Sequence, residues 1–513
     1  MKKLLNIFFV SAIAAMMLLS CVKDEDLNIA DPNKIASDNV FSSGEAAIQA
    51  LNGAYAPLAE VNLWGNEIHF FLSQASGEFS LKWKGEVRWN QFENLTLLTE
   101  DNQAVKGFWI SLYNVIYRAN DVLHNIDKVP SGELTEQRIE QAKGEAYFLR
   151  GFAYSYLIMM FSDYYPNKTI DGWGVPIIIE NAGSREEMFV PRSSVEEVMN
   201  QAISDFDQAA QLLPESWSGQ DKGRAIKYGA VGMKGRLYHF LGLYQEATEA
   251  FEEVVNNSAH ELVPDFRSLF DGSNENNSES LFEIQYALPE VSSNNSYNYG
   301  PGPAYPWTHG NGAIGGWENV GIPDESVIPL EGDPRQRATV FMEGDTVKPG
   351  TTWNTYPFNS IGYSPKKWIR IDEPARFGAS STEFSGEINM TILRLADIYL
   401  MYSEALIESG GSEETAREYI NKVRRRAHEV NIDVASDYDV PPGSPNLLDT
   451  LKNERYVEFF GEGIYWFDLV RWGNAPDSLS EKGFVEGKHE RLPIPIQEIE
   501  LNEALEGQQN QGY

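Results

Sequence analysis

The chain has 513 residues, of which 42% are hydrophobic and 12% aromatic, enough to build a buried core and to exclude a disordered chain. Acidic residues outnumber basic ones by 75 to 41, which gives a formal net charge of −34. A surface of this sign repels phosphate backbones, so the composition argues against nucleic acid as a partner. It also disfavours acidic ligands unless a local basic pocket exists.

The N-terminus has the anatomy of a lipoprotein export signal. Two lysines precede an apolar run over residues 4–19, and Leu-Leu-Ser stands directly before Cys21, the only cysteine. A membrane-spanning helix needs about 20 apolar residues. The run has 16, so we predict a cleaved signal peptide over residues 1–20 and a lipid on Cys21. The alternative is a signal peptide that merely happens to contain a buried cysteine. The charged residues that follow predict a solvated tether over 21–40.

Residues 41–265 contain segments in which apolar residues recur with the period of an amphipathic helix. These segments are 105–126, 142–160, 195–213, 226–241 and 245–255. The third segment follows a pair of serines that can cap a helix, and it stops before Pro214. In the last two, small alanines lie where two helices would touch, and Gly242 begins a tight turn between them. This pattern is typical of a tetratricopeptide-like helical hairpin.

The composition changes over residues 266–387, where Gly, Asn, Ser, Pro and aromatic residues dominate. Helical periodicity returns in the segments 392–408, 413–428 and 447–460, and a proline-stiffened stretch at 492–495 follows them. We therefore predict a mainly all-α fold, in which tetratricopeptide-like hairpins form a scaffold with a large loop-rich insert and few short strands. The parts 41–265 and 266–513 are expected to form one integrated fold.

The sequence carries no recognisable catalytic or metal-binding motif. Its seven histidines lack metal-ligand spacing on a shared helix face, and neither a serine-hydrolase elbow nor a phosphate-binding glycine loop occurs. Residues 271–275 alternate oxygen-bearing side chains, but Phe282 stands where a calcium loop needs an acid. We predict no catalytic residue, metal or cofactor. A glycosidase pair among the 75 acidic residues stays open, because sequence gives no distances between carboxylates.

Motifs of one known family occur in family order through most of the chain. They lie at 109–120, 145–152, 174–176, 223–225, 276–284, 332–335, 394–405, 420–424, 454–455, 463–473, 492–495 and 512–513. On these motifs the chain resembles the SusD/RagB family of surface lipoproteins. One departure is Tyr465, which stands where a basic residue is usual in the family. Most charged motif residues, such as Asp397 and Asp468, are expected to satisfy buried partners, because buried charges must be paired.

The resemblance implies both a fold and a function. The family is helical, with tetratricopeptide-like units and a variable loop-rich side. Its members capture nutrients beside a SusC-like TonB-dependent transporter of the outer membrane and open and close over it like a lid. Residues 23–25, Lys-Asp-Glu, resemble the signal that carries such lipoproteins to the outer face of that membrane. We expect a non-enzymatic, lipid-anchored outer-membrane protein that faces the cell exterior and delivers oligosaccharides to the transporter.

Sugar rings have flat apolar faces, so we expect exposed aromatic rings in the loop-rich stretches to bind them. The candidates are Trp83, Trp89, Trp307 and Trp317, with Asn90 and Asn311 as hydroxyl partners. The alternative for each tryptophan is that it covers an apolar patch beneath a loop. Trp109, Trp466 and Trp472 lie at periodic or motif positions and are expected in the core.

Other functions stay open for the whole chain. They are peptide capture, as in some relatives, a surface glycosidase, and a structural lipoprotein without a ligand.

Overall fold

The computed structural model describes residues 40–82, 84–286, 319–348, 351–352, 362–369 and 388–513. Five predicted positions lie outside the described residues: Cys21, Trp83, Trp307, Asn311 and Trp317. Within the described ranges, no helix combines the length and the apolarity needed to cross a membrane. The described chain is mainly helical with few short strands, which confirms the predicted fold class.

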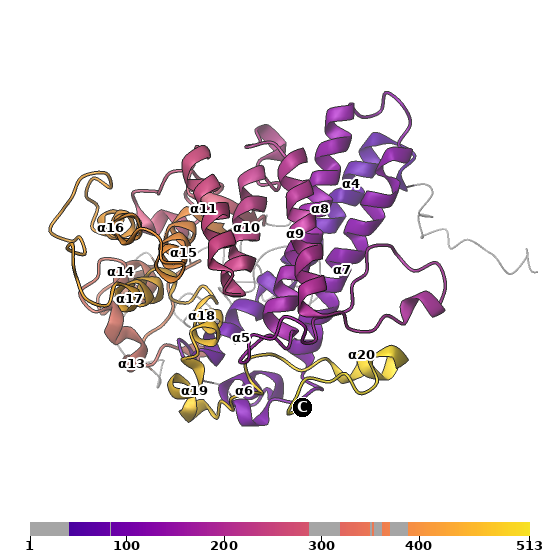
Figure 1. Ribbon diagram of the computed structural model, residues 1–513. Coiled ribbons are helices and arrows are strands. Elements are labelled where there is room, and N and C mark those ends of the chain that lie inside the picture. The colour runs from indigo at the N-terminus through magenta and orange to yellow at the C-terminus, as the bar shows by residue number, and fades with distance from the viewer. Residues whose placement is uncertain (1–39, 83, 287–318, 349–350, 353–361, 370–387) are drawn as a thin grey trace, which may run out of the picture.

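Four helices stand side by side in the N-terminal part (Figure 1): α4 Gly44–Tyr55, α7 Gln103–Asn125, α8 Glu136–Phe161 and α9 Val195–Leu212. α8 packs against both α7 and α9, and α4 packs against α7 and α8. The predicted serine cap is confirmed, because the Ser194 hydroxyl accepts a hydrogen bond from the Glu197 N–H. The Glu197 carboxylate accepts one in return from the Ser194 N–H, which closes a capping box.

Two helical hairpins follow along the chain. The first pairs α10 Lys227–Phe240 with α11 Tyr244–Asn257, and the second pairs α15 Leu395–Glu408 with α16 Glu413–Ala427. α11 also packs against α15, so the hairpins stack side by side (Figure 1). Gly242 turns the first hairpin at φ +68°, a conformation that favours glycine. A Cβ on Gly235 would lie 2.5 Å from the Phe251 ring, so only glycine allows these two helices to approach so closely.

Short antiparallel strand pairs tie the loop-rich part to the helices. β2 Ser280–Ile284 pairs with β6 Met390–Arg394, and β4 Thr346–Lys348 pairs with β5 Thr351–Thr352. β1 Ser80–Leu81 pairs with β3 Val320–Gly321. Each strand has at most five residues, so the ladders fix local register and the helices carry the fold.

The remaining elements are short, apart from one C-terminal helix, α17 Leu447–Phe459. The shorter helices are α5 Glu67–Ala75, α6 Val87–Glu93, α13 Asp324–Val327, α14 Gln336–Thr339, α18 Tyr465–Arg471, α19 Ala475–Ser478 and α20 Ile496–Leu501. The 3-10 and π turns are η1 Ala56–Ala59, η2 Val61–Gly65, η3 Leu95–Leu97, η4 Ile126–Lys128, η5 Glu186–Met188, η6 Gly219–Asp221, η7 Phe266–Leu269, η9 Ile328–Leu330, η11 Ser480–Lys482 and η12 Glu503–Leu505.

One connected cluster of buried apolar side chains runs from Phe41 to Ile494 and draws on both halves of the chain. Trp109 and Trp466 belong to it, as expected from their positions. Trp109 packs edge-on against Phe161, with the ring centroids 5.1 Å apart.

Candidate functional site

The β1–β3 pair joins two regions that are far apart in the sequence. Ser80 lies opposite Gly321, and the Lys82 N–H donates a hydrogen bond to the Asn319 carbonyl at 2.8 Å. One region contains α5 and α6, and the other leads into α13. Residues 80–82 and residues 319–321 of the loop-rich insert therefore lie side by side.

A groove of about 830 Å³ opens beside this ladder. It lies among α6, α13, α17, α18 and α19, which gather along the lower side of the molecule in Figure 1. Small-molecule sites in proteins commonly have volumes of about 300–1,000 Å³. The lining residues used below are Ser80, Lys84, Asn90, Glu93, Glu325, Ser326, Lys452, Asn453, Tyr456, Tyr465, Leu469, Trp472, Asn474, Glu481 and Lys482.

Of the two predicted ligand residues that the structure describes, Asn90 lines the groove and Trp89 does not. The Trp89 side chain is only 6% exposed and packs edge-on against Phe70, with the ring centroids 5.2 Å apart. A ring covered in this way has no free face for a sugar, so the structure contradicts the predicted stacking role of Trp89. The contact with Phe70 arises because α5 and α6 fold against each other. The hydroxyl-binding role of Asn90 stays a prediction.

Aromatic side chains of α17 and α18 form one wall of the groove. Tyr456 and Tyr465 pack edge-on at 4.6 Å, and both are half-buried. Tyr465, Leu469 and Trp472 follow the spacing i, i+4, i+7, which places them on one face of α18. Trp472 is half-buried and lines the groove, so the expectation that it belongs wholly to the core is wrong. This spacing is visible in the sequence, but the sequence does not reveal that the face borders a groove.

Both tyrosines keep their phenolic protons at neutral pH. Burial raises the pKa of Tyr465 to about 12 and raises that of Tyr456 well above its usual value. The Tyr456 hydroxyl donates a hydrogen bond to the Ser326 carbonyl at 2.9 Å, which fixes the ring against the α13 side of the groove. The wall therefore consists of oriented, uncharged aromatic rings.

Polar side chains line the rest of the groove. The half-buried Glu93 accepts hydrogen bonds from the Ser80 hydroxyl at 2.7 Å and from the Leu81 N–H at 3.1 Å. Burial alone would raise the pKa of Glu93, but Lys482, Ser80 and Gln74 together hold it below its usual value. The Lys482 ammonium lies 3.4 Å from this carboxylate. Amides at Asn90, Asn453 and Asn474 add neutral groups that can both donate and accept hydrogen bonds.

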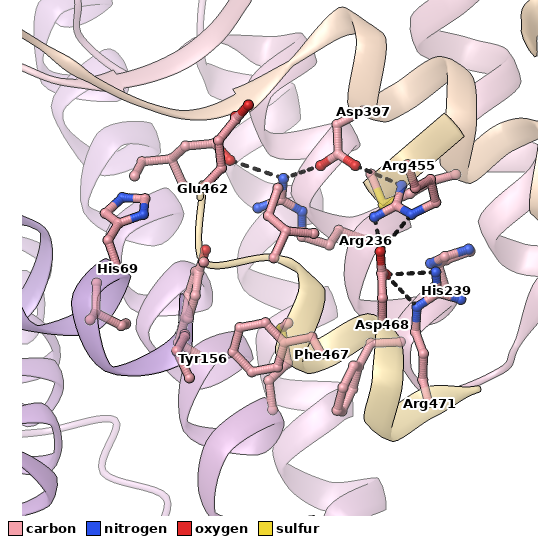
Figure 2. Close-up of a pocket in the computed structure, with 18 of the residues that line it drawn as sticks. His69, Tyr156, Arg236, His239, Asp397, Arg455, Glu462, Phe467, Asp468 and Arg471 are labelled. Carbon is pink, nitrogen blue, oxygen red and sulfur yellow. Dashed lines mark hydrogen bonds and ion pairs between the residues drawn. The ribbon is translucent and has the colours of Figure 1, made fainter. Parts of the chain in front are cut away.

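A buried ionic network joins α18 to α17 and α15 (Figure 2). Asp468 on its inner face accepts hydrogen bonds from Arg455 at 2.8 Å and from Arg471 at 2.7 Å. Arg471 also donates to Glu404 on α15 at 2.7 Å. The Trp472 indole N–H donates to the same Glu404 at 2.7 Å. The network therefore fixes the orientation of Trp472, which reaches the groove from the adjoining face.

The same network satisfies the charged motif residues, as expected from the sequence. Asp397 pairs with Arg455 at 3.0 Å and with Arg236, and all three side chains are buried. The cavity among these residues measures about 50 Å³, which is room for a few water molecules and too little for a sugar ring. We regard this cluster as a support for the groove and not as a ligand site.

The described residues contain no cluster of three or more His, Cys, Asp or Glu side chains placed to hold a metal ion. In the stretch that alternates oxygen-bearing residues, Asp271 accepts a hydrogen bond from the Ser273 N–H. Glu275 accepts one from the Asn389 N–H. Both acids therefore brace the local backbone.

Comparisons with known proteins identify the class. Residues 278–490 match the family model described as the SusD family, and residues 27–239 match one described as starch-binding associating with outer membrane. SusD-like protein P2 of Formosa agariphila is 26% identical over 96% of this chain and 97% of its own length. The chain belongs to the SusD family.

Solved structures agree with this assignment. A laminarin-binding SusD-like protein is 26% identical, covers 91% of this chain and 99% of its own, and superimposes with a TM-score of 0.75. A SusD homologue from Bacteroides thetaiotaomicron is 21% identical and has a TM-score of 0.77 over 93% of this chain and 98% of its own. At 21% identity, the similarity to this second structure shows only that the two chains share a fold.

Proposed function

We propose that the protein is a glycan-binding lipoprotein of the outer membrane and that its groove beside the β1–β3 pair binds a neutral oligosaccharide. The observation that carries the proposal is that half-buried, oriented aromatic rings and amide side chains line the same groove. Rings of this kind suit the apolar faces of sugars, and amides suit hydroxyl groups. The laminarin-binding relative, which shares the fold over nearly its whole length, supports this choice of ligand class.

Binding would use groups that are held in place before the ligand arrives. The Trp472 ring is fixed by its hydrogen bond to Glu404, and the Tyr456 ring by its bond to Ser326. Ordering a free side chain on binding costs about 0.5–1.5 kcal/mol. Rings that are already fixed avoid most of that cost.

The groove can be tested with a glycan-panel binding screen. Trp472→Ala and Tyr465→Ala should each weaken binding of the best ligand by at least about tenfold. Trp173→Ala and Tyr117→Ala are matched controls, because these rings are 40% and 58% exposed and do not line the groove. Asn474 is exposed, so Asn474→Ala should leave the fold intact and still test the groove if the aromatic variants lose stability. A glycan that binds all five variants as tightly as the parent protein would refute the groove assignment.

The lipid anchor on Cys21, the exterior-facing location and delivery to a SusC-like transporter complete the proposal. They rest on the signal sequence and on the family. Cys21→Ala should move the protein from the membrane fraction to the soluble fraction, and co-purification of a TonB-dependent transporter would support delivery. Persistence of the variant in the membrane fraction would contradict the anchor.

A second candidate is a surface glycosidase. Incubation of the pure protein with the polysaccharide it binds decides between the two: release of shorter products would overturn the binding-only function.

A further inference from the structure

Among the described residues, acidic and basic side chains line the groove in equal numbers, a balance that suits a neutral ligand. Three of these side chains are exposed to solvent: Lys84, Glu325 and Glu481. The other three are half-buried: Glu93, Lys452 and Lys482. Packing restricts the half-buried groups most, so what a ligand meets depends on which of them have hydrogen-bonding capacity to spare.

Glu93 and Lys482 use their capacity on the protein itself. The Glu93 carboxylate accepts hydrogen bonds from the Ser80 hydroxyl at 2.7 Å, from the Leu81 N–H at 3.1 Å and from the Gln74 amide at 3.1 Å. The Lys482 ammonium is the fourth partner, at 3.4 Å. A carboxylate has about four acceptor positions. The acceptor positions of Glu93 are therefore filled, and its partner Lys482 is held on it.

The Lys452 ammonium keeps all of its donors. Lys452 stands four residues before Tyr456 on α17, so both side chains lie on the same face of the helix, and both line the groove. Its Nζ atom lies 5.0 Å from the centroid of the Trp472 ring, a cation–π contact. Among the described residues, the ammonium has no carboxylate or hydrogen-bond partner. Its three N–H donors are thus available to a ligand.

Lys452 is also the cation that a ligand at Trp472 would meet. The Arg471 guanidinium lies 4.8 Å from the centroid of the same ring, but Arg471 is buried in the ionic network of Figure 2 and does not line the groove. Lys452 approaches the ring from the groove. A sugar that contacts the Trp472 indole therefore comes within reach of the Lys452 ammonium.

We infer that Lys452 is a specificity-determining residue of the groove, and that its ammonium donates hydrogen bonds to hydroxyl oxygens of the sugar unit in contact with Trp472. The inference rests on the proposed function, because it concerns the ligand of that groove. An ammonium only donates, so this sugar unit must carry an acceptor oxygen beside the indole. A site built around such a bond rejects an analogue that lacks the oxygen. The groove thus selects a hydroxyl-bearing unit over a deoxy sugar at this position.

Calorimetric titration of the full chain tests this role. The probes are oligosaccharides of laminarin and of starch, together with any other glycan that the panel identifies. Lys452→Met keeps the length of the side chain and removes its charge and donors. It should weaken binding at least about fivefold, because a hydrogen bond to a charged group contributes more than one between neutral groups. Lys452→Arg keeps the charge and the donors and should recover most of the affinity.

A matched control and a set of modified ligands separate the hydrogen bond from other effects. Lys227→Met is the control, because the half-buried Lys227 also places its ammonium over a ring, that of Tyr228 at 4.9 Å, and does not line the groove. It should bind the probe as the parent protein does. Among analogues of the probe that each lack one hydroxyl group, one should bind the parent and Lys452→Met proteins equally, since it lacks the oxygen that Lys452 binds.

Three outcomes would overturn the inference. They are equal or tighter binding by Lys452→Met, a Lys452→Arg protein as weak as the Met variant, and a loss in Lys452→Met that every deoxy analogue retains. The first would show that the ammonium only covers the indole. Binding that Trp472→Ala weakens and Lys452→Met does not would leave the proposed function standing without this inference. A parent protein that binds no glycan of the panel would overturn both.

Discussion

Replacing Glu78 with glutamine tests the buried contact between the two sides of the groove. Glu78 is fully buried just before β1, and its carboxylate accepts hydrogen bonds from the Gly461 N–H at 2.7 Å and from the Ser76 hydroxyl at 2.8 Å. Burial raises its pKa to about 7, although both hydrogen bonds lower it. At neutral and higher pH the protein therefore holds a poorly solvated negative charge at this position.

The sign and size of the effect follow from linkage. A carboxyl group whose pKa is raised in the folded state contributes stability that is fully present below its unfolded value of 4.5 and is lost as pH rises through about 7. At about 1.4 kcal/mol per pKa unit, the loss is about 3 kcal/mol above pH 8. Glutamine keeps an acceptor for Gly461 and carries no charge. Glu78→Gln should therefore be more stable than the parent protein at pH 8 by up to about 3 kcal/mol and nearly equal to it at pH 4.5.

Urea unfolding curves at both pH values measure this difference. The matched control is Glu246→Gln, an exposed glutamate on α11 that should show little change in stability at either pH. A Glu78→Gln protein that is less stable than the parent at pH 8 would refute the reasoning. It would mean that the ionised carboxylate is a net stabiliser of the Gly461 turn.

Three further substitutions test the scaffold. Glu404→Ala should lower the free energy of unfolding by about 3 kcal/mol, because the buried Arg471 loses its carboxylate partner. It should also weaken glycan binding, because the Trp472 indole N–H loses its acceptor; unchanged urea unfolding would argue against the network. Gly235→Ala should lower the free energy of unfolding by about 1–3 kcal/mol, since the new methyl group would overlap the Phe251 ring of α11. An unchanged melting temperature would show that the two helices can move apart without loss of stability. Trp89→Ala removes a buried ring and should lower the free energy of unfolding by about 3–5 kcal/mol, measured by the same unfolding curves. A loss below about 1 kcal/mol would indicate that this ring lies at the surface.

The helices could be predicted from sequence because their signal is local. The apolar stripes of 105–126 and 195–213 repeat every three or four residues, and caps such as Ser194 and stops such as Pro214 mark their ends. The glycine turn at Gly242 was predictable for the same reason. None of these inferences requires knowledge of what lies opposite in space.

The groove could be predicted only in part, because it depends on contacts between distant segments. Asn90 was proposed as a ligand residue and lines the groove, although its role stays a prediction. Its neighbour Trp89 turns inward against Phe70, a contact that sequence spacing does not reveal. The position of Trp472 in a family motif led to the prediction that it lies in the core. The groove that it lines lies beside the β1–β3 pair, which joins residues far apart in the chain. Exposure of a motif residue is decided by tertiary packing, which a single sequence does not show.

The most direct test of glycan binding in the groove is a crystal structure with the tightest ligand of the glycan panel. The proposal predicts a sugar ring in contact with the Trp472 indole, with its hydroxyl groups within hydrogen-bond distance of Asn90, Asn453 or Asn474. A ligand bound at full occupancy elsewhere on the protein, with the groove empty, would contradict it.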